Sequence, residues 1–180
     1  MSPLTGPCEG YTEHLFSINN IILTVNVHNT LSEYLNPWTN STDKAGVMVM
    51  SPKEDETLLL ERAERDKHPN IIETPAGGQE KKDTSPIATA IRECWEETGL
   101  YVTEILRCFI QGWEREGKAV QKITFIGKVY HHTDDKLPEI TLRPEEHKTS
   151  YWVKKDQLQQ IDGTKFWPGA KAQMVKNFDF

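Results

Sequence analysis

The stretch GGQEKKDTSPIATAIRECWEETGL, residues 77–100, joins a pair of glycines to a segment with strong helical signals. Ser85 suits a helix N-cap, Pro86 suits the first helical position, and Gly99 suits the C-terminal stop. Apolar side chains recur at the i, i+3, i+4, i+7 spacing of one buried helical face, at Ile87, Ala90, Ile91 and Cys94. The sequence therefore predicts a helix between Ser85 and Gly99 that buries this face.

Three glutamates, Glu93, Glu96 and Glu97, lie at i, i+3 and i+4 in the predicted helix. Each residue turns a helix by about 100°, so the three carboxylates share one face. Like charges at i,i+4 oppose helix formation by roughly 0.2–0.5 kcal/mol per pair, and the helix dipole disfavours negative charge near the C-terminal end. Mg²⁺ or Mn²⁺ would remove this repulsion, because both ions favour clustered oxygen ligands. The alternative is a solvated acidic face in which Arg92 pairs with Glu96.

Length and charge narrow the class of protein. The chain has 180 residues, of which 37% are hydrophobic and 27% are charged, and its net charge is −6. This length is close to that of one domain and allows a core to close without disulfides or metals. The negative charge and the lack of a basic run argue against a nucleic-acid partner. A divalent cation could still bring an anionic small molecule to an acidic protein.

The cysteines and the N-terminal residues indicate a cytoplasmic protein. The three cysteines are an odd number and form no CxxC, so they predict neither a disulfide framework nor a zinc site. Residues 1–14 lack the apolar segment of a signal peptide. The longest apolar run, near IILTV, is far shorter than the ~18 residues of a membrane span. We therefore expect no membrane association.

The pattern of apolar runs and turn residues predicts the remaining elements. We expect an N-terminal arm over residues 1–15 and a single domain over 16–180. The predicted strands are 16–27, 45–51, 57–63, 70–78, 102–113, 120–131 and 150–153, with 45–51 and 57–63 forming a hairpin. Helical turns are predicted at 30–35 and helices at 154–161 and 168–178, with loops at 36–43, 114–119 and 132–148. Partly antiparallel strands around a central helix predict either an α/β/α or an α+β sandwich.

The segment RECWEETGL, residues 92–100, resembles the second half of the Nudix box, GX5EX7REUXEEXGU, in which U is a bulky aliphatic residue. Counting back, Gly78 falls on the first glycine of the box, and Cys94 holds its first U position. The preceding ETPAGG, residues 73–78, resembles the strand and turn that lead into the box. With these flanks, the resemblance to the Nudix superfamily extends over residues 45–160.

This resemblance implies an α/β fold, the Nudix α/β/α sandwich, with a mixed β-sheet and a loop–helix–loop metal site. It also implies a hydrolase that uses Mg²⁺ or Mn²⁺ to cleave a diphosphate linkage in a nucleotide-like or other organic diphosphate. The metal ligands it implies are Glu93, Glu96, Glu97 and the carbonyl of Gly77. Arg92 would orient a glutamate of the helix. The general base would be either Glu93 or Glu146, an acid shortly before Tyr151-Trp152-Val153.

Thr84 departs from the box, because it stands where the first glutamate is expected. A neutral hydroxyl cannot replace a carboxylate, so one metal ion would bind more weakly or be lost. Asp83 or Glu80 could substitute if the loop shifts, or Thr84 could simply help to cap the helix beside Ser85. The alternative function is a degenerate Nudix domain with non-hydrolytic chemistry on a small metabolite, or one that only binds a ligand.

Two special cases of the alternative are weaker. An isopentenyl diphosphate isomerase would need a reactive cysteine, but Cys94 is predicted to face the core and Cys108 lies in a strand. A protein-interaction module would have no use for the acidic cluster.

Substrate contacts are predicted at two residues. Arg62 could reach phosphates, with surface ion pairing as the alternative, and Trp113 could line the substrate pocket from the end of a strand. The loops that would shape this pocket contain no recognisable substrate-binding motif, so the sequence does not predict the substrate. The β-rich N-terminal segment could also pair between two subunits, which would make a homodimer.

Overall fold

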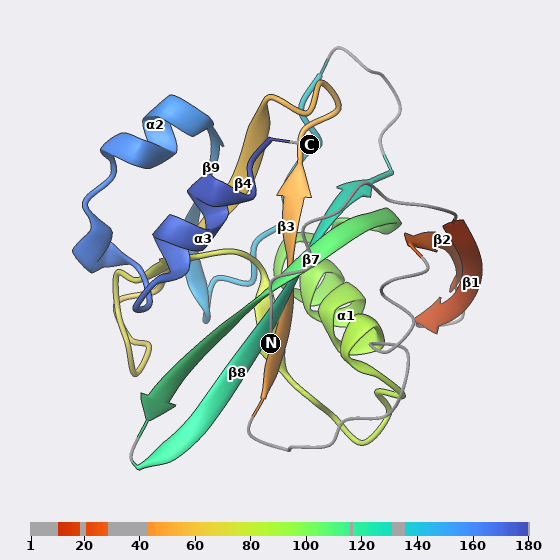
Figure 1. Cartoon of the computed structure of the whole chain (residues 1–180), viewed down its shortest axis with the longest axis horizontal. Coiled ribbons are helices and arrows are strands. Elements are labelled where there is room, and N and C mark those ends of the chain that lie inside the picture. Colours follow the sequence, from red (N-terminus) through yellow and green to blue (C-terminus); the bar gives the residue numbers. More distant parts are fainter. Residues whose placement is uncertain (1–10, 19–20, 29–42, 116, 131–135, 180) are drawn as a thin grey trace.

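The computed structural model describes residues 11–18, 21–28, 43–115, 117–130 and 136–179. The strands are β1 (Tyr11–Ile18), β2 (Ile21–His28), β3 (Lys44–Met50), β4 (Glu56–Arg62), β5 (Ile72–Glu73), β6 (Ala76–Gly78), β7 (Val102–Arg115), β8 (Lys118–Val129) and β9 (His147–Lys154). The helices are α1 (Pro86–Thr98), α2 (Lys155–Gln160) and α3 (Ala170–Lys176), with a 3₁₀ turn, η2, at Gly163–Lys165. Figure 1 shows these elements along the chain.

The strands form one mixed sheet. Seven of them follow the order β1-β2-β7-β8-β3-β4-β5, while β6 pairs with β3 and β9 pairs with β4. Strands β3 and β8 are parallel, whereas β7 and β8 form a long antiparallel hairpin. The predicted hairpin of β3 and β4 is confirmed by their antiparallel pairing.

Helix α1 has the predicted ends. Ser85 Oγ accepts the Ala88 N–H at 3.2 Å, and Pro86 occupies the first turn. At the other end, Gly99 adopts a left-handed conformation with φ of 72°, and its N–H donates to Trp95 O. The four apolar residues of the predicted stripe are fully buried: Ile87, Ala90, Ile91 and Cys94.

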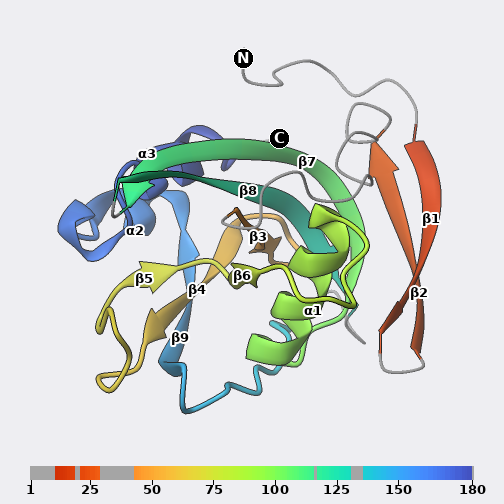
Figure 2. The ribbon, with the colours of Figure 1, turned by 90° about the horizontal axis from the view of Figure 1, so that it is seen from below.

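Helices cover both faces of the sheet, which confirms the predicted α/β/α sandwich (Figure 2). Side chains alternate between the faces along each strand. The face under α1 contributes Val47, Val49, Leu58, Leu60, Ile105 and Phe125 to one core. The face under α2 and α3 contributes Met48, Met50, Leu59, Phe109 and Ile126 to a second core, which Leu158 and Met174 of the helices complete.

Several predicted strands were wrong in extent, and the predicted strand 70–78 is two short strands, β5 and β6. Strands β7 and β8 continue into the predicted loop 114–119, because cross-strand pairing persists as far as Arg115↔Lys118. The predicted strand 150–153 begins earlier, at His147, because β9 pairs with β4 from Arg62 to Glu56. The predicted strand 16–27 is two antiparallel strands, β1 and β2, since an apolar alternation does not mark a chain reversal.

The N-terminal predictions are only partly covered by the described residues. Of the predicted arm 1–15, residues 11–15 belong to β1, and residues 1–10 lie outside the described part. The helical turns at 30–35 lie outside it as well, and so does all of the loop 36–43 except Asp43. Within the described ranges, no helix has both the length and the apolar character needed to cross a membrane.

Candidate metal site

Arg92 links the glycine turn to helix α1. The side chain is 3% exposed. Its Nε and Nη2 donate to the Asp83 carboxylate at 3.0 and 2.8 Å, and Nη2 also donates to the Gly78 carbonyl at 2.8 Å. Its Nη1 lies 2.9 Å from both Glu96 Oε2 and Glu93 Oε1. One guanidinium thus contacts the turn and two of the three glutamates on α1.

Asp83, and not Thr84, places a carboxylate beside Arg92. The Asp83 side chain is buried and also accepts from Thr89 Oγ1 at 3.1 Å and from the Glu80 N–H at 2.8 Å. Burial alone would raise the pKa of Asp83, but Arg92 and the other donors lower it below its usual value. The Thr84 side chain is exposed. The acid next to Arg92 therefore comes from one position earlier than the box predicts.

Glu80 is the weaker candidate to replace the missing acid. Its side chain is 52% exposed and lies 3.3 Å from Lys82 Nζ and 3.6 Å from Arg92 Nη1. Surface ion pairs of this kind contribute little to stability. The helix cap that Thr84 could have formed comes instead from Ser85.

Glu93 packs against the glycine turn. A Cβ atom on Gly77 would lie 2.1 Å from Glu93 Oε1, so only glycine lets this carboxylate approach the turn. Burial raises the pKa of Glu93, Arg92 opposes that shift, and the charges of Glu96 and Glu146 add to it. The structure therefore brings Glu93 close to Gly77, whose carbonyl is the predicted backbone ligand.

Glu97 is the most deeply buried of the three helix glutamates. Its Oε2 accepts the Ala76 N–H of β6 at 2.9 Å, which fixes the side chain under the turn. Burial, together with the charges of Glu73 and Glu93, raises the pKa of Glu97 well above its usual value. Buried carboxylates that repel one another in this way are stabilised when a cation binds between them.

Glu96 differs from the other two glutamates because two cationic side chains contact it. Its Oε2 accepts from Arg92 Nη1 at 2.9 Å and its Oε1 accepts from Lys82 Nζ at 3.2 Å. Metal ligation by Glu96 stays a prediction, and it would compete with these two partners.

Glu146 lies close to Glu97 and belongs to the loop that precedes β9. Two backbone bonds hold this loop, from Thr141 N to Thr98 O at 2.9 Å and from Ala63 N to Glu146 O at 2.8 Å. Arg143 Nη1 donates to Glu146 Oε1 at 2.8 Å, and the Glu146 side chain remains 38% exposed. The loop therefore presents the predicted base candidate at the open side of the carboxylate cluster.

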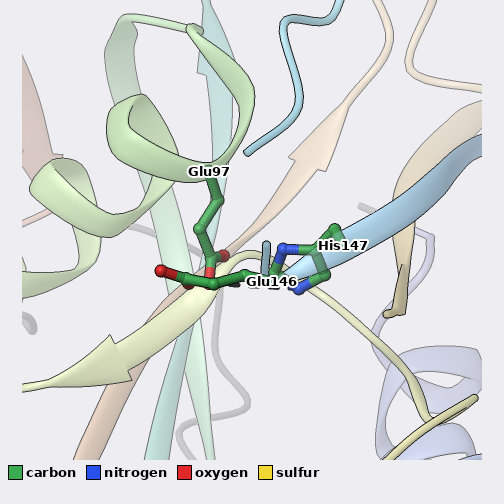
Figure 3. Close-up of side chains that lie close together, drawn as sticks. All are labelled: Glu97, Glu146 and His147. Atoms are coloured by element: carbon green, nitrogen blue, oxygen red, sulfur yellow. Dashed lines mark ion pairs between the residues drawn. The ribbon is translucent and has the colours of Figure 1, made fainter. Parts of the chain in front are cut away.

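His147 joins this cluster although the sequence placed it in a loop. One ligand atom each from Glu97, Glu146 and His147 lie within 4.8 Å of one another (Figure 3). A β-bulge explains the position. Thr149 pairs with Glu61, but the next pair along is His147 with Arg62, which leaves Lys148 as an extra residue. Apolar patterning does not reveal a bulge, so the sequence favours a solvated side chain for His147, as for the other charged residues of this loop.

The two predicted substrate residues are not members of the three-residue cluster, although Arg62 pairs with His147 between β4 and β9. The Arg62 guanidinium donates to Asp66 at 2.9 and 2.8 Å and to Glu73 Oε1 at 2.5 Å. Trp113 lines a closed cavity of about 10 Å³ on the α3 side of the sheet, together with Lys122 and Trp167. Such a cavity has room for about one water molecule. Substrate binding by either residue stays a prediction and would require rearrangement.

Residues 41–177 match the family described as the NUDIX domain, which covers more than half of the chain. The chain belongs to the Nudix family. The resemblance seen in residues 78–100 is thereby confirmed at the family level. Nudix hydrolases act on diphosphate bonds and typically use divalent metals. No curated protein sequence matches this Nudix chain.

Solved structures share the fold of this Nudix domain. A MutT protein from Methanosarcina mazei Go1 is 22% identical, with a TM-score of 0.61 over 80% of this chain and 94% of that chain. An Ap4A hydrolase from C. elegans is 18% identical, with a TM-score of 0.56 over 76% and 96%. A bifunctional NMN adenylyltransferase/ADP ribose pyrophosphatase from Francisella tularensis, complexed with AMP and a Mn ion, is 15% identical, with a TM-score of 0.61 over 84% and 47%.

Proposed function

We propose that this Nudix domain is a Mg²⁺- or Mn²⁺-dependent hydrolase that cleaves a diphosphate linkage in a nucleotide-like or other organic diphosphate. The observation that carries the proposal is the group of buried or half-buried carboxylates where α1, the glycine turn and the loop before β9 meet. Glu97 and Glu146 offer oxygens within 4.8 Å of each other, and Glu93 packs on Gly77 beside them.

The donor set fits a hard divalent cation. Carboxylate oxygens from Glu93, Glu96 and Glu97 and the carbonyl of Gly77 would hold the ion, since oxygen ligands suit Mg²⁺ and Mn²⁺. Bound there, the ion supplies an activated water and neutralises charge on the phosphate oxygens. The raised pKa of Glu97 supports this role, because burial and the charges of Glu73 and Glu93 disfavour its ionised form and a bound cation would offset both effects.

The side chains around the ligands have separate tasks. Arg92 is a positioning residue, because it holds the glycine turn and the carboxylates of Glu93 and Glu96 in one arrangement. Either Glu146 or Glu93 would accept the proton of the attacking water. The two differ in access to solvent, because the Glu146 side chain is 38% exposed, whereas Glu93 is buried against Arg92.

Asp83 and Cys94 favour hydrolysis over the alternatives. The degenerate-domain hypothesis depended on the missing acid at Thr84, whereas Asp83 supplies a carboxylate that holds Arg92, the residue that positions Glu93 and Glu96. An isomerase would need a reactive thiol, yet burial raises the pKa of Cys94 to about 12. Both observations support the hydrolase.

The relatives indicate which substrates to test first. The C. elegans protein is an Ap4A hydrolase, and the Francisella protein includes an ADP ribose pyrophosphatase. We infer that a nucleoside diphosphate linked to a second group is the first class to examine. A homodimer, a cytoplasmic location and phosphate contacts by Arg62 stay predictions of the sequence.

The test is a hydrolysis assay with Mg²⁺ or Mn²⁺ on ADP-ribose and other nucleotide sugars, dinucleoside polyphosphates and isoprenoid diphosphates, with chromatographic detection of products. We expect turnover of at least one class and a loss on the order of 100-fold in Glu97→Gln. The exposed Glu145→Gln is the matched control and should retain activity. Folded protein that turns over none of these compounds with either ion would contradict the proposal.

A further inference from the structure

His147 is a buried imidazole whose ring nitrogens have no hydrogen bond to the described part of the chain. The residue is 1% exposed, and both Nδ1 and Nε2 lack a partner. Leaving a buried polar group unpaired lowers stability, so an unpaired buried histidine needs a physical reason. A bound metal ion is one such reason, because neutral imidazole is a common metal ligand.

The surroundings of His147 contain suitable partners for a metal. Figure 3 shows Glu97 reaching from α1 toward Glu146, at the end of the preceding loop, and His147, the first residue of β9. One ligand atom from each of the three residues lies within 4.8 Å of the other two. The bulge at Lys148 produces this arrangement, since it shifts the register between β9 and β4 at His147.

An ion pair with Glu73 explains His147 less well. His147 Nε2 lies 3.8 Å from Glu73 Oε1 and 4.0 Å from Glu97 Oε1, which is too long for a hydrogen bond. Glu73 also has two donors of its own, because its Oε1 accepts from Arg62 at 2.5 Å and its Oε2 accepts from Trp167 Nε1 at 2.7 Å. Both of these hydrogen bonds remain when the imidazole binds a metal ion.

We propose that His147 supplies a nitrogen ligand to a metal ion shared with Glu97 and Glu146, so that the site binds first-row transition ions more tightly than Mg²⁺. This inference rests on the proposed metal-dependent function. It adds a ligand that the Nudix box does not contain and an order of preference among ions.

The chemistry of the donors sets this preference. Mg²⁺ is bound mainly by oxygen ligands and dehydrates reluctantly. Imidazole suits softer ions, and affinity for mixed nitrogen and oxygen sites rises from Mn²⁺ to Co²⁺ and beyond. A site with one nitrogen among its oxygen donors should therefore rank Co²⁺ above Mn²⁺ and both above Mg²⁺.

The first experiment measures binding of the metals alone to the full chain by calorimetry, without substrate. We expect His147→Phe, which keeps a planar ring, to weaken Co²⁺ and Mn²⁺ binding by about 10–100-fold. Mg²⁺ binding should change by no more than about 3-fold, because His147 contributes least to that ion. His68→Phe is the matched control, because His68 packs edge-on against Trp167 and is not one of the three residues of the cluster.

The second experiment needs no variant. Electron spin echo modulation of Mn²⁺ bound to the wild-type protein should show a directly coordinated ¹⁴N, and Glu97→Gln should remove the bound ion. A wild-type spectrum without ¹⁴N coupling would overturn the assignment, as would unchanged Co²⁺ and Mn²⁺ affinities in folded His147→Phe.

The two proposals fail in different ways. Metal binding that Glu97→Gln abolishes but His147→Phe leaves unchanged would overturn the nitrogen ligand and leave the hydrolase standing. Binding that Glu97→Gln does not change would overturn the metal site itself, and with it the role of His147.

Discussion

Asp83 and Thr84 are adjacent in the sequence but differ completely in environment. Asp83 is buried and accepts hydrogen bonds from Arg92, Thr89 and the Glu80 N–H, whereas Thr84 is exposed. Asp83→Ala should therefore destabilise the protein by about 3 kcal/mol, because it leaves a buried guanidinium without its main partner. Urea denaturation monitored by circular dichroism measures this loss.

Thr84 provides the control at the same site. Thr84→Ala should change stability by no more than about 0.5 kcal/mol. Thr84→Glu, which restores the residue that the box predicts, should leave metal affinity within about 2-fold, because the side chain at this position points to solvent. A large gain in affinity would show that Asp83 does not fill the role of the missing acid.

Gly77 is a second residue whose importance depends on its neighbour. A Cβ atom there would lie 2.1 Å from Glu93 Oε1, while one on Gly78 would lie 3.1 Å from the flexible end of Lys44. Gly77→Ala should displace the Glu93 carboxylate and weaken Mn²⁺ binding by roughly 10-fold or more. Calorimetry on both variants tests this, and equal effects of Gly77→Ala and Gly78→Ala would be inconsistent with the packing described.

At the scale of elements, the left-handed end of α1 holds the metal-site helix in place. Gly99 has φ of 72°, and a Cβ atom would lie 3.2 Å from Thr141 Cβ in the loop that leads to Glu146. Gly99→Ala should cost about 1–2 kcal/mol, because an L-residue is strained in this conformation and must also crowd the loop. Thermal unfolding gives the measurement.

Gly117 makes it possible to separate the backbone strain at Gly99 from the crowding of the Thr141 loop. It has φ of 73°, but a Cβ atom there would meet nothing within 4 Å. Gly117→Ala should therefore show the backbone strain alone, about 1 kcal/mol. If the two variants are equally destabilised, the contact between α1 and the Thr141 loop contributes nothing measurable.

For the whole molecule, two buried glutamates make the metal-free stability depend on pH with opposite signs. Burial and the neighbouring carboxylates raise the folded pKa of Glu97, so its contribution is complete below the usual 4.5 and is lost as pH rises through the folded pKa. Burial also raises the pKa of Glu73, but the neighbouring His147 side chain, the charges of Lys122 and Arg62 and the Trp167 N–H outweigh it and lower the pKa to about 2. That contribution is complete above 4.5 and is lost as pH falls through about 2.

Glu97→Gln tests the sign of the first effect. Without metal at about pH 7.5, the variant should be more stable than the wild type by about 0.5–2 kcal/mol, because it removes a charge that burial disfavours. The gain should shrink as the pH falls, because the wild-type residue takes up its proton at a higher pH than an ordinary glutamate does. Denaturation in EDTA at several pH values gives the profile, and a gain independent of pH would argue against a raised pKa.

Adding metal should reverse the order of stability. Mn²⁺ at about 100 times its Kd should stabilise the wild type by roughly 2.7 kcal/mol, since the ion binds the folded chain. Glu97→Gln should gain much less, because it lacks the ligand. The same destabilising carboxylate thus becomes stabilising when the site is filled.

Much of the fold could be predicted because its signals are local. The cap at Ser85, the stop at Gly99 and the apolar stripe of α1 depend on neighbours within a few turns, and all were placed correctly. Strand ends were harder, because strand pairing, as between β9 and β4, depends on residues far away in the chain. The bulge at Lys148 is the clearest case, since it moved His147 from a predicted loop into the site.

The sequence alone was sufficient to predict the helix, its three-glutamate face and the glycine turn, because a helical period and a turn are properties of adjacent residues. The partners of those residues were settled by long-range packing. The loop before α1 places Asp83 in contact with Arg92, and the Arg62 side chain forms ion pairs with Asp66 and Glu73. The strength of a charge interaction depends on the distance between the two groups in space, and the packing of the sheet and helices sets that distance.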